Sequence, residues 1–200
     1  MNLPNKITTF RMVCVIIIDF LLLFPWANVG VNIPVIFGNC SLIYFICFVL
    51  FLVASFSDYL DGHIARKYNL VTTYGKFMDP IADKLLVDTL FIICAIKNPS
   101  LVPATVAVIM IARDLLVDAL RLIASSKGLV LAANMWGKTK TVSQMVALSF
   151  VLLCGWPFSY FDSSWAISMT AIICYIAMAF SLISGVLYFT KNLNVFKDND

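Results

Sequence analysis

The sequence predicts an all-α, polytopic membrane protein, a single domain over residues 1–200 with six transmembrane helices. Hydrophobic residues make up 62% of the chain and its mean hydropathy is +0.94, whereas soluble globular proteins contain roughly 45–50% apolar residues. Charged residues make up only 12%, so nearly every helix is expected to face lipid or another helix. This composition excludes a disordered chain, a coiled coil, a secreted disulfide scaffold and a nucleic-acid-binding domain.

Six apolar segments are each long enough to cross a bilayer, which takes about 20 residues. They cover residues 7–26, 34–57, 76–97, 100–124, 139–156 and 165–190. Turn-forming residues separate them, such as Gly30 after the first, Asn98-Pro99 after the third and Gly155-Trp156-Pro157 after the fifth. We expect the first segment to be retained rather than cleaved as a signal sequence, because Asp19 interrupts its apolar core.

The distribution of cations predicts the orientation in the membrane. Of the 14 Lys and Arg residues, all except Lys97 fall on one side of the six-helix arrangement. Because such cations concentrate in cytosolic loops, we expect a multi-pass plasma-membrane protein with both termini in the cytosol. The loops on the opposite side are short and nearly uncharged, so the active site is also expected on the cytosolic side.

The acidic residues predict a metal site. All 11 are Asp, and four of them form two pairs at helical spacing, Asp58 with Asp61 and Asp79 with Asp83. Carboxylates that converge from neighbouring helix ends repel one another unless they hold cations or are protonated. Their oxygen atoms suit Mg²⁺ or Mn²⁺ rather than zinc. We therefore predict two divalent ions, the usual means of stabilising an in-line displacement at phosphorus; a solvated loop would not require this spacing.

The residues around these pairs carry a family resemblance. They read Asp58-x-x-Asp61-Gly62-x-x-Ala65-Arg66 and then Gly75-x-x-x-Asp79-x-x-x-Asp83. This pattern resembles the signature of the CDP-alcohol phosphatidyltransferases at every position. The resemblance implies CDP-diacylglycerol as the donor, bound along Gly62, Ala65, Arg66 and Gly75, and a homodimer in the membrane. It also makes Asp83, which can touch a metal, the best candidate for the general base. Arg66 has an equal alternative role, pairing with an Asp or with lipid headgroups.

The rise of an α-helix predicts that two charged residues, Asp83 and Arg113, lie at a similar depth within the membrane. Asp83 precedes Lys97 by 14 residues, and Arg113 follows Ser100 by 13. At 1.5 Å per residue, both lie about 20 Å from the outer helix ends. Intramembrane charges usually mark a functional cavity, so we expect a polar cavity that opens to the cytosol.

The cations near this cavity suit an acceptor that carries a phosphate. Arg113 and Arg121 lie eight residues apart, near one helix face, and Lys138 and Lys140 open the fifth apolar segment. Guanidinium and ammonium groups are strong donors to a phosphate dianion. The charges alone indicate a phosphate, and the family resemblance implies glycerol 3-phosphate as the acceptor, so we predict that these four side chains bind its phosphate.

Two further segments resemble bacterial members of the family that make phosphatidylglycerophosphate. One is Asn2–Arg11, and the other is Ala112–Arg121 followed by Gly137–Thr141 and Gln144. Asp114 stands where those members more often have Glu, and its role stays open. The resemblance implies a bacterial enzyme of phospholipid biosynthesis. In the reaction it implies, the acceptor hydroxyl attacks the lipid-side phosphorus, assisted by two metals, and CMP leaves.

Two alternatives stay open. The first is the same fold acting on another acceptor, such as inositol phosphate, serine or phosphatidylglycerol. The second is an ion-coupled transporter, which would also hold intramembrane Asp residues. Transporter sites lie near the midplane between repeats, whereas here the acids gather toward one face and no repeat is visible.

Overall fold

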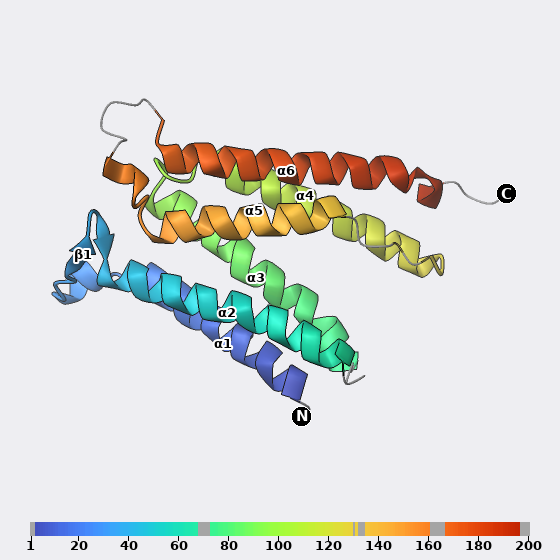
Figure 1. Ribbon diagram of the computed structural model, residues 1–200, viewed down its shortest axis with the longest axis horizontal. Coiled ribbons are helices and arrows are strands. Elements are labelled where there is room, and N and C mark those ends of the chain that lie inside the picture. Colours follow the sequence, from blue (N-terminus) through green and yellow to red (C-terminus); the bar gives the residue numbers. More distant parts are fainter. Residues whose placement is uncertain (1–2, 68–72, 130, 132–134, 161–166, 197–200) are drawn as a thin grey trace.

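The computed structural model describes residues 3–67, 73–129, 131, 135–160 and 167–196 (Figure 1). Its α-helices within these ranges are α1 (Leu3–Leu23), α2 (Leu42–Lys67), α3 (Thr73–Lys97), α4 (Ala104–Ser126), α5 (Met135–Leu152) and α6 (Met169–Lys191). Short 3-10 helices lie at η1 (Trp26–Val29), η2 (Phe158–Tyr160) and η4 (Leu193–Phe196). The prediction of an all-helical chain with six long helices is confirmed for this part of the chain, with one small exception.

The exception is a short β-hairpin between α1 and α2. Strand β1 (Val35–Phe37) pairs antiparallel with β2 (Cys40–Ser41). Gly38 in the turn has a φ of 51°, in the left-handed region that favours glycine. The predicted helix over 34–57 therefore begins only at Leu42, and the prediction was wrong for its first eight residues.

Other helix ends differ from the prediction for local reasons. Helix α4 begins at Ala104 rather than at residue 100, because Pro103 directly before it is extended, with a ψ of 136°. Helix α5 ends at Leu152 rather than at residue 156, because Cys154 and Gly155 adopt left-handed φ angles of 53° and 81°. Helix α3 continues through Pro80, which lies inside it.

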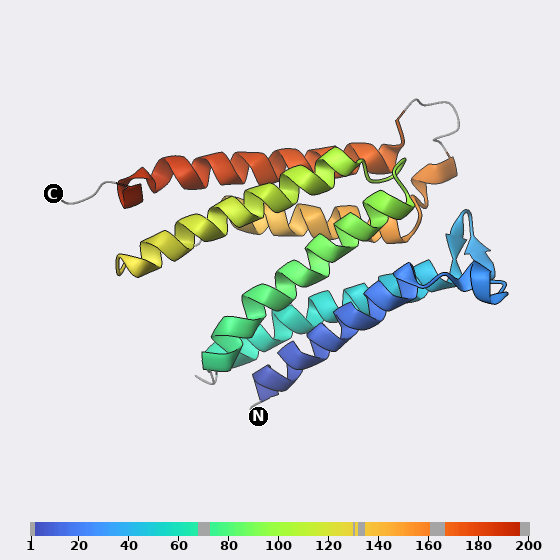
Figure 2. The ribbon, with the colours of Figure 1, turned by 180° about the vertical axis from the view of Figure 1, so that it is seen from behind.

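The helices form two groups of three. Helix α1 packs against α2 and α3, and α6 packs against α4 and α5, as both views show (Figures 1 and 2). The groups lie close together at the hairpin end and diverge toward the opposite end, where α1 begins and α6 ends (Figure 1). We call this opposite end the open end of the bundle. The polar residues described below gather there.

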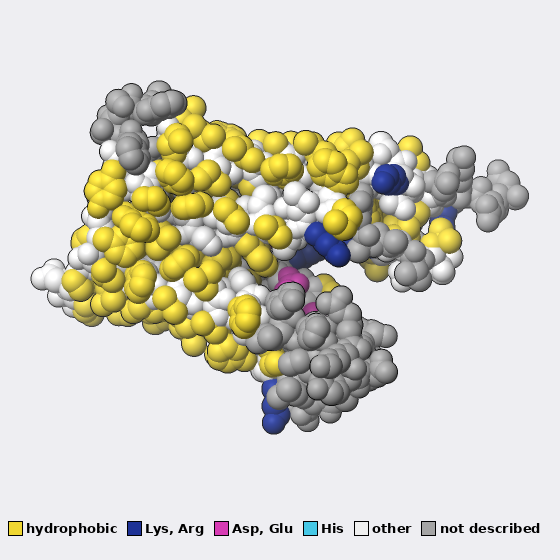
Figure 3. Space-filling view, viewed as in Figure 1, with side chains coloured by type: hydrophobic (Ala, Val, Ile, Leu, Met, Phe, Trp, Pro, Cys, Tyr) yellow, Lys and Arg dark blue, Asp and Glu magenta, His cyan; other side chains and the backbone are white. Residues whose placement is uncertain are grey.

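Apolar side chains form both the core and much of the outer surface. Leu90 of α3, Val106 of α4 and Leu148 of α5 are completely buried where the two groups meet. Large apolar side chains also cover the outer faces of the helices (Figure 3), among them Ile16 and Val186. So extensive an exposed apolar surface is typical of contact with a membrane or a partner protein.

Length and hydropathy alone identify α6 as the helix, among the described residues, that could span a membrane, with residues 42–58 as a shorter apolar stretch. Other helices combine an apolar outer face with inward charges. Arg11 of α1 and Asp114 of α4, for example, are buried. Such charges lower the mean hydropathy of a helix although they point into the protein. The outer face of the helix is therefore more apolar than its mean hydropathy indicates.

Candidate active site

Side chains of three helices meet around the predicted carboxylates. Arg11 of α1 donates through Nη1 to Oδ1 of Asp83 on α3, at 2.5 Å, and through Nη2 to Oδ1 of Asp58 on α2, at 2.9 Å. One turn earlier on α1, the hydroxyl of Thr8 donates to Oδ1 of Asp79 at 2.6 Å. Residues three or four apart share a helix face, so a single face of α1 holds carboxylates from both neighbouring helices.

Arg11 supplies the positive charge of this cluster. Its side chain has 0% relative exposure, whereas those of Asp58 and Asp83 are 35% and 49% exposed. The guanidinium is therefore covered by protein while both carboxylates still reach solvent. A buried arginine requires such partners, because burying an unpaired charge is costly.

Part of the predicted donor site lies outside the described residues. The backbone of α2 extends to Lys67, but the side chains of Asp61, Gly62, Ala65 and Arg66 belong to the part of the chain that is not described. Gly75 is buried in the first turn of α3, four residues before Asp79. Because glycine has no side chain, a ligand can approach the backbone closely at this position.

The carboxylates are chemically suitable ligands for a hard divalent ion. Among the side chains that are described, no group of three acidic, His or Cys residues is close enough to hold a metal ion. Asp58, Asp79 and Asp83 nevertheless all contact one face of α1, and their oxygen atoms are the donors that Mg²⁺ and Mn²⁺ prefer. The chemistry of this donor set fits the predicted ions, and Asp61, the fourth predicted ligand, has its side chain outside the described part.

A cavity of about 430 Å³ brings the predicted acids and cations together. Asp79 and Asp83 of α3 line one side, while Arg113 and Arg121 of α4 line another. Lys138 and Lys140 of α5 also line it. The space-filling view shows Lys, Arg and Asp side chains gathered where the two helix groups diverge (Figure 3). Carboxylates of α3 and cations of α4 and α5 thus line one cavity, together with Lys84 of α3 and with Asp114 and Asp118 of α4.

Asp114 connects two of these cations. Its carboxylate is buried, with 5% relative exposure; Oδ1 accepts from Arg113 Nη1 at 2.7 Å and Oδ2 accepts from Lys140 Nζ at 2.5 Å. Charge-assisted bonds of this kind are among the stronger ones in proteins. The residue whose role the sequence left open therefore holds α4 and α5 together beside the cavity.

Further residues line the cavity that the sequence analysis did not include in the site. Lys84 of α3 forms an ion pair with Asp118 of α4, and Asp88 lies one turn beyond Lys84 in the cavity wall. Tyr188 and Ser184 of α6 contact Arg121 and Arg113. The periodicity of α3 could have indicated Asp88, since it lies four residues after Lys84.

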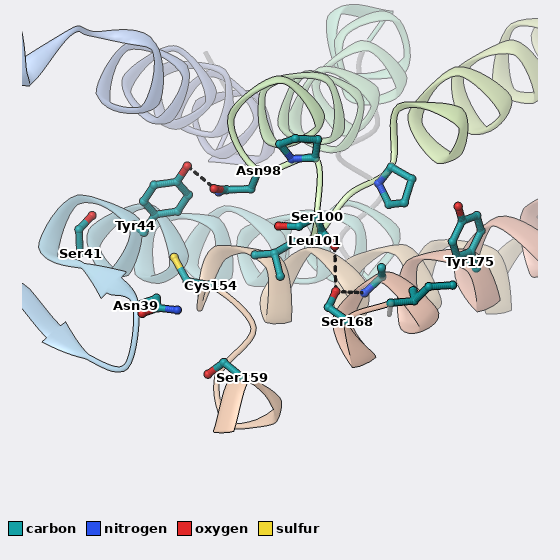
Figure 4. A pocket seen from close by; sticks show the side chains of 14 residues that line it. Asn39, Ser41, Tyr44, Asn98, Ser100, Leu101, Cys154, Ser159, Ser168 and Tyr175 are labelled. Atoms are coloured by element: carbon teal, nitrogen blue, oxygen red, sulfur yellow. Dashed lines mark hydrogen bonds between the residues drawn. The ribbon is translucent and has the colours of Figure 1, made fainter. Parts of the chain in front are cut away.

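A second, larger cavity of about 820 Å³ lies at the hairpin end of the bundle (Figure 4). Its described lining consists of neutral residues such as Asn39, Ser100 and Tyr175. Tyr44 accepts a hydrogen bond from Asn98 there, at 2.8 Å. Because no described residue in its wall is charged, this cavity does not suit a phosphate-bearing substrate.

Comparison with known proteins identifies the family. The model of the CDP-alcohol phosphatidyltransferase family matches residues 1–186, so the chain belongs to this family. The family is membrane-bound and generally metal-dependent.

Several curated relatives are similar over almost their whole length. The chain is 39% identical to a CDP-diacylglycerol–glycerol-3-phosphate 3-phosphatidyltransferase of Bacillus subtilis, with 100% of the chain and 99% of the relative covered. Proteins of the same description from Mycoplasma pneumoniae and Rickettsia bellii are each 36% identical. Each alignment covers 94% of the chain, with 86% of the first relative and 93% of the second.

Proposed function

We propose that the chain transfers the phosphatidyl group of CDP-diacylglycerol to glycerol 3-phosphate, producing phosphatidylglycerophosphate and CMP. The full-length similarity to bacterial relatives described by this reaction supports the proposal. The observation that carries it is one cavity that Asp79 and Asp83 line together with Arg113 and Lys140. Carboxylates are suited to hold metal ions at an activated diphosphate, and the two cations are suited to a phosphate monoester.

In the proposed reaction, a hydroxyl oxygen of glycerol 3-phosphate forms a bond to the phosphorus beside the diacylglycerol. The bond between that phosphorus and the oxygen of the CMP phosphate breaks, and CMP leaves with the electron pair. Asp83, half exposed in the cavity wall, takes the proton of the acceptor hydroxyl as general base. Lys138, Lys140, Arg113 and Arg121 bind the acceptor phosphate.

Asp58, Asp61, Asp79 and Asp83 would hold the divalent ions, which when bound neutralise negative charge on the reacting diphosphate. Arg11 and Thr8 keep three of these carboxylates together through the bonds described above. Gly62, Ala65, Arg66 and Gly75 would line the path of the cytidine and its phosphates. In this assignment, residues of α2 and α3 bind the donor, and residues of α4 and α5 bind the phosphate of the acceptor.

We also propose that all six helices cross a bacterial plasma membrane, with both termini and the active site in the cytosol. The apolar outer faces and the antiparallel order of successive helices support this arrangement (Figures 1 and 3). The start of α1 and the end of α6 lie at the open end of the bundle (Figure 1). A homodimer, implied by the family resemblance, stays a prediction.

The proposed activity can be tested with the purified full-length chain in detergent or vesicles. CDP-diacylglycerol and Mg²⁺ are supplied with glycerol 3-phosphate, inositol phosphate, serine or phosphatidylglycerol in turn, and CMP release is measured. We expect release only with glycerol 3-phosphate. CMP release only with another alcohol would show that glycerol 3-phosphate is not the acceptor. No CMP release with any of the alcohols would contradict the proposed activity.

Replacing Arg113 with Ala tests the acceptor site. We expect the apparent KM for glycerol 3-phosphate to rise by roughly 10- to 100-fold, since hydrogen bonds to charged groups contribute about 1.5–3 kcal/mol. The KM for CDP-diacylglycerol should stay within about twofold, because Arg113 lies on the acceptor side of the cavity. Lys127→Ala, an exposed cation at the end of α4, is the matched control. Equal rises in both KM values would remove Arg113 from the acceptor site.

A further inference from the structure

Helix α6 carries a polar stripe, although it is the helix that qualifies as a membrane span by composition. Ser181, Ser184, Gly185 and Tyr188 are all buried in it. Their spacing of three, four and seven residues from Ser181 places them on one face. Three of them, Ser184, Gly185 and Tyr188, contact side chains of α4. The sequence predicts no functional residue in this segment.

Two hydroxyl groups of this face hold the two arginines of the acceptor site. Ser184 Oγ accepts from Nη2 of Arg113 at 2.8 Å. Tyr188 Oη accepts from Nε of Arg121 at 3.2 Å, and the Arg121 guanidinium carbon lies 5.3 Å from the centre of the Tyr188 ring. This last distance is within the range of a cation–π contact.

Gly185 provides the room that Arg113 needs. A Cβ atom added at this glycine would lie 3.0 Å from Cγ and 3.2 Å from Nε of Arg113. Real Cβ contacts are rarely so short, so any larger residue would push the Arg113 side chain away from α6. The bond to Ser184 and the direction of the guanidinium both depend on this space.

Arg113 is consequently fixed from two sides. Asp114 accepts from its Nη1 group and Ser184 from its Nη2 group, while Gly185 lies against its aliphatic stem. A long flexible side chain loses conformational entropy when it binds a ligand, and fixing it beforehand reduces that loss. A fixed guanidinium also presents its donors in one plane, which suits bidentate binding of a phosphate.

We propose that Ser184, Gly185 and Tyr188 form a positioning surface on α6 that presents Arg113 and Arg121 to the phosphate monoester of the acceptor. The proposal rests on the proposed function and adds a determinant of acceptor affinity. These three are positioning residues, because they contact the arginines and act through them. An acceptor without a phosphate gains nothing from this surface.

Three single variants test the surface: Ser184→Ala, Gly185→Ala and Tyr188→Phe. We expect each to raise the KM for glycerol 3-phosphate by about 3- to 10-fold, the equivalent of one hydrogen bond. The kcat and the KM for CDP-diacylglycerol should stay within about twofold. Ser181→Ala is the matched control, since Ser181 is a buried serine on the same face for which the described residues supply no hydrogen-bond partner.

A binding measurement separates this proposal from the proposed function. The affinity of each variant for glycerol 3-phosphate is measured by calorimetry without CDP-diacylglycerol, and inorganic phosphate serves as a second probe. We expect both ligands to bind more weakly to the three variants than to the wild type and to Ser181→Ala. Unchanged affinities in folded Ser184→Ala and Tyr188→Phe would overturn the positioning role. A wild-type protein that does not release CMP with glycerol 3-phosphate would instead refute the function.

Discussion

Asp79→Asn is expected to reduce CMP release to less than about a hundredth of the wild-type rate while leaving the fold intact. Loss of even an indirect metal contact typically costs 10- to 100-fold, and Asp79 is proposed as a direct ligand in the cavity wall. Asn keeps the size of the side chain and still accepts the hydrogen bond of Thr8. What it removes is the negative charge.

Two measurements accompany the rate. Thermal unfolding of the metal-free variant should match that of the wild type, and Mn²⁺ binding should weaken. Asp19→Asn is the matched control: Asp19 accepts a hydrogen bond from Thr89 at 3.0 Å and is not among the residues that line the cavity. Substantial residual turnover in Asp79→Asn, with normal Mn²⁺ affinity, would refute the metal role of Asp79.

Arg11→Met should lower the thermal stability of the protein by several degrees. The substitution removes two charge-assisted bonds, to Asp58 and Asp83, that tie α1 to α2 and α3. Since both carboxylates are partly exposed, solvent compensates for some of the loss. We expect about 1–3 kcal/mol in the free energy of unfolding, below the cost of breaking a fully buried pair.

Divalent ions should partly replace the missing charge. We expect added Mn²⁺ to raise the unfolding temperature of Arg11→Met more than that of the wild type, because the two carboxylates then repel each other without a cation between them. Lys6→Met, an exposed cation on the same helix, should change neither quantity. An Arg11→Met protein with wild-type stability would show that Arg11 does not hold the three helices together.

The sequence indicated several charged residues that line the cavity, but not Lys84, Asp88 or Asp118, nor the residues with which they pair. Asp79 and Asp83 were evident from helical spacing, and Arg113 from its depth in an apolar segment. The same depth argument applies to Arg11, which also interrupts an apolar segment, but its partner Asp83 is 72 residues away in the chain. Contacts of this kind depend on how helices pack, which periodicity within one helix does not determine.

Other features needed the structure for different reasons. The turn residues Gly38-Asn39 between two short runs are a hairpin signal that the prediction of a helix over 34–57 did not use. The apolar run by itself is also compatible with a helix. Ser184 and Gly185 are ordinary in a membrane helix, where small residues commonly allow close packing. Only the path of the Arg113 side chain between α4 and α6 gives them a role.

The division of the bundle into two groups of three helices has an evolutionary consequence. The carboxylates proposed to handle the nucleotide-activated lipid lie on α2 and α3, braced by α1, whereas the arginines that would select the alcohol lie on α4, braced by α6. Substitutions in the second group can therefore alter the alcohol while the first group is left unchanged. One ancestral scaffold could diversify into enzymes for different headgroups by exchanging residues on one half of the molecule.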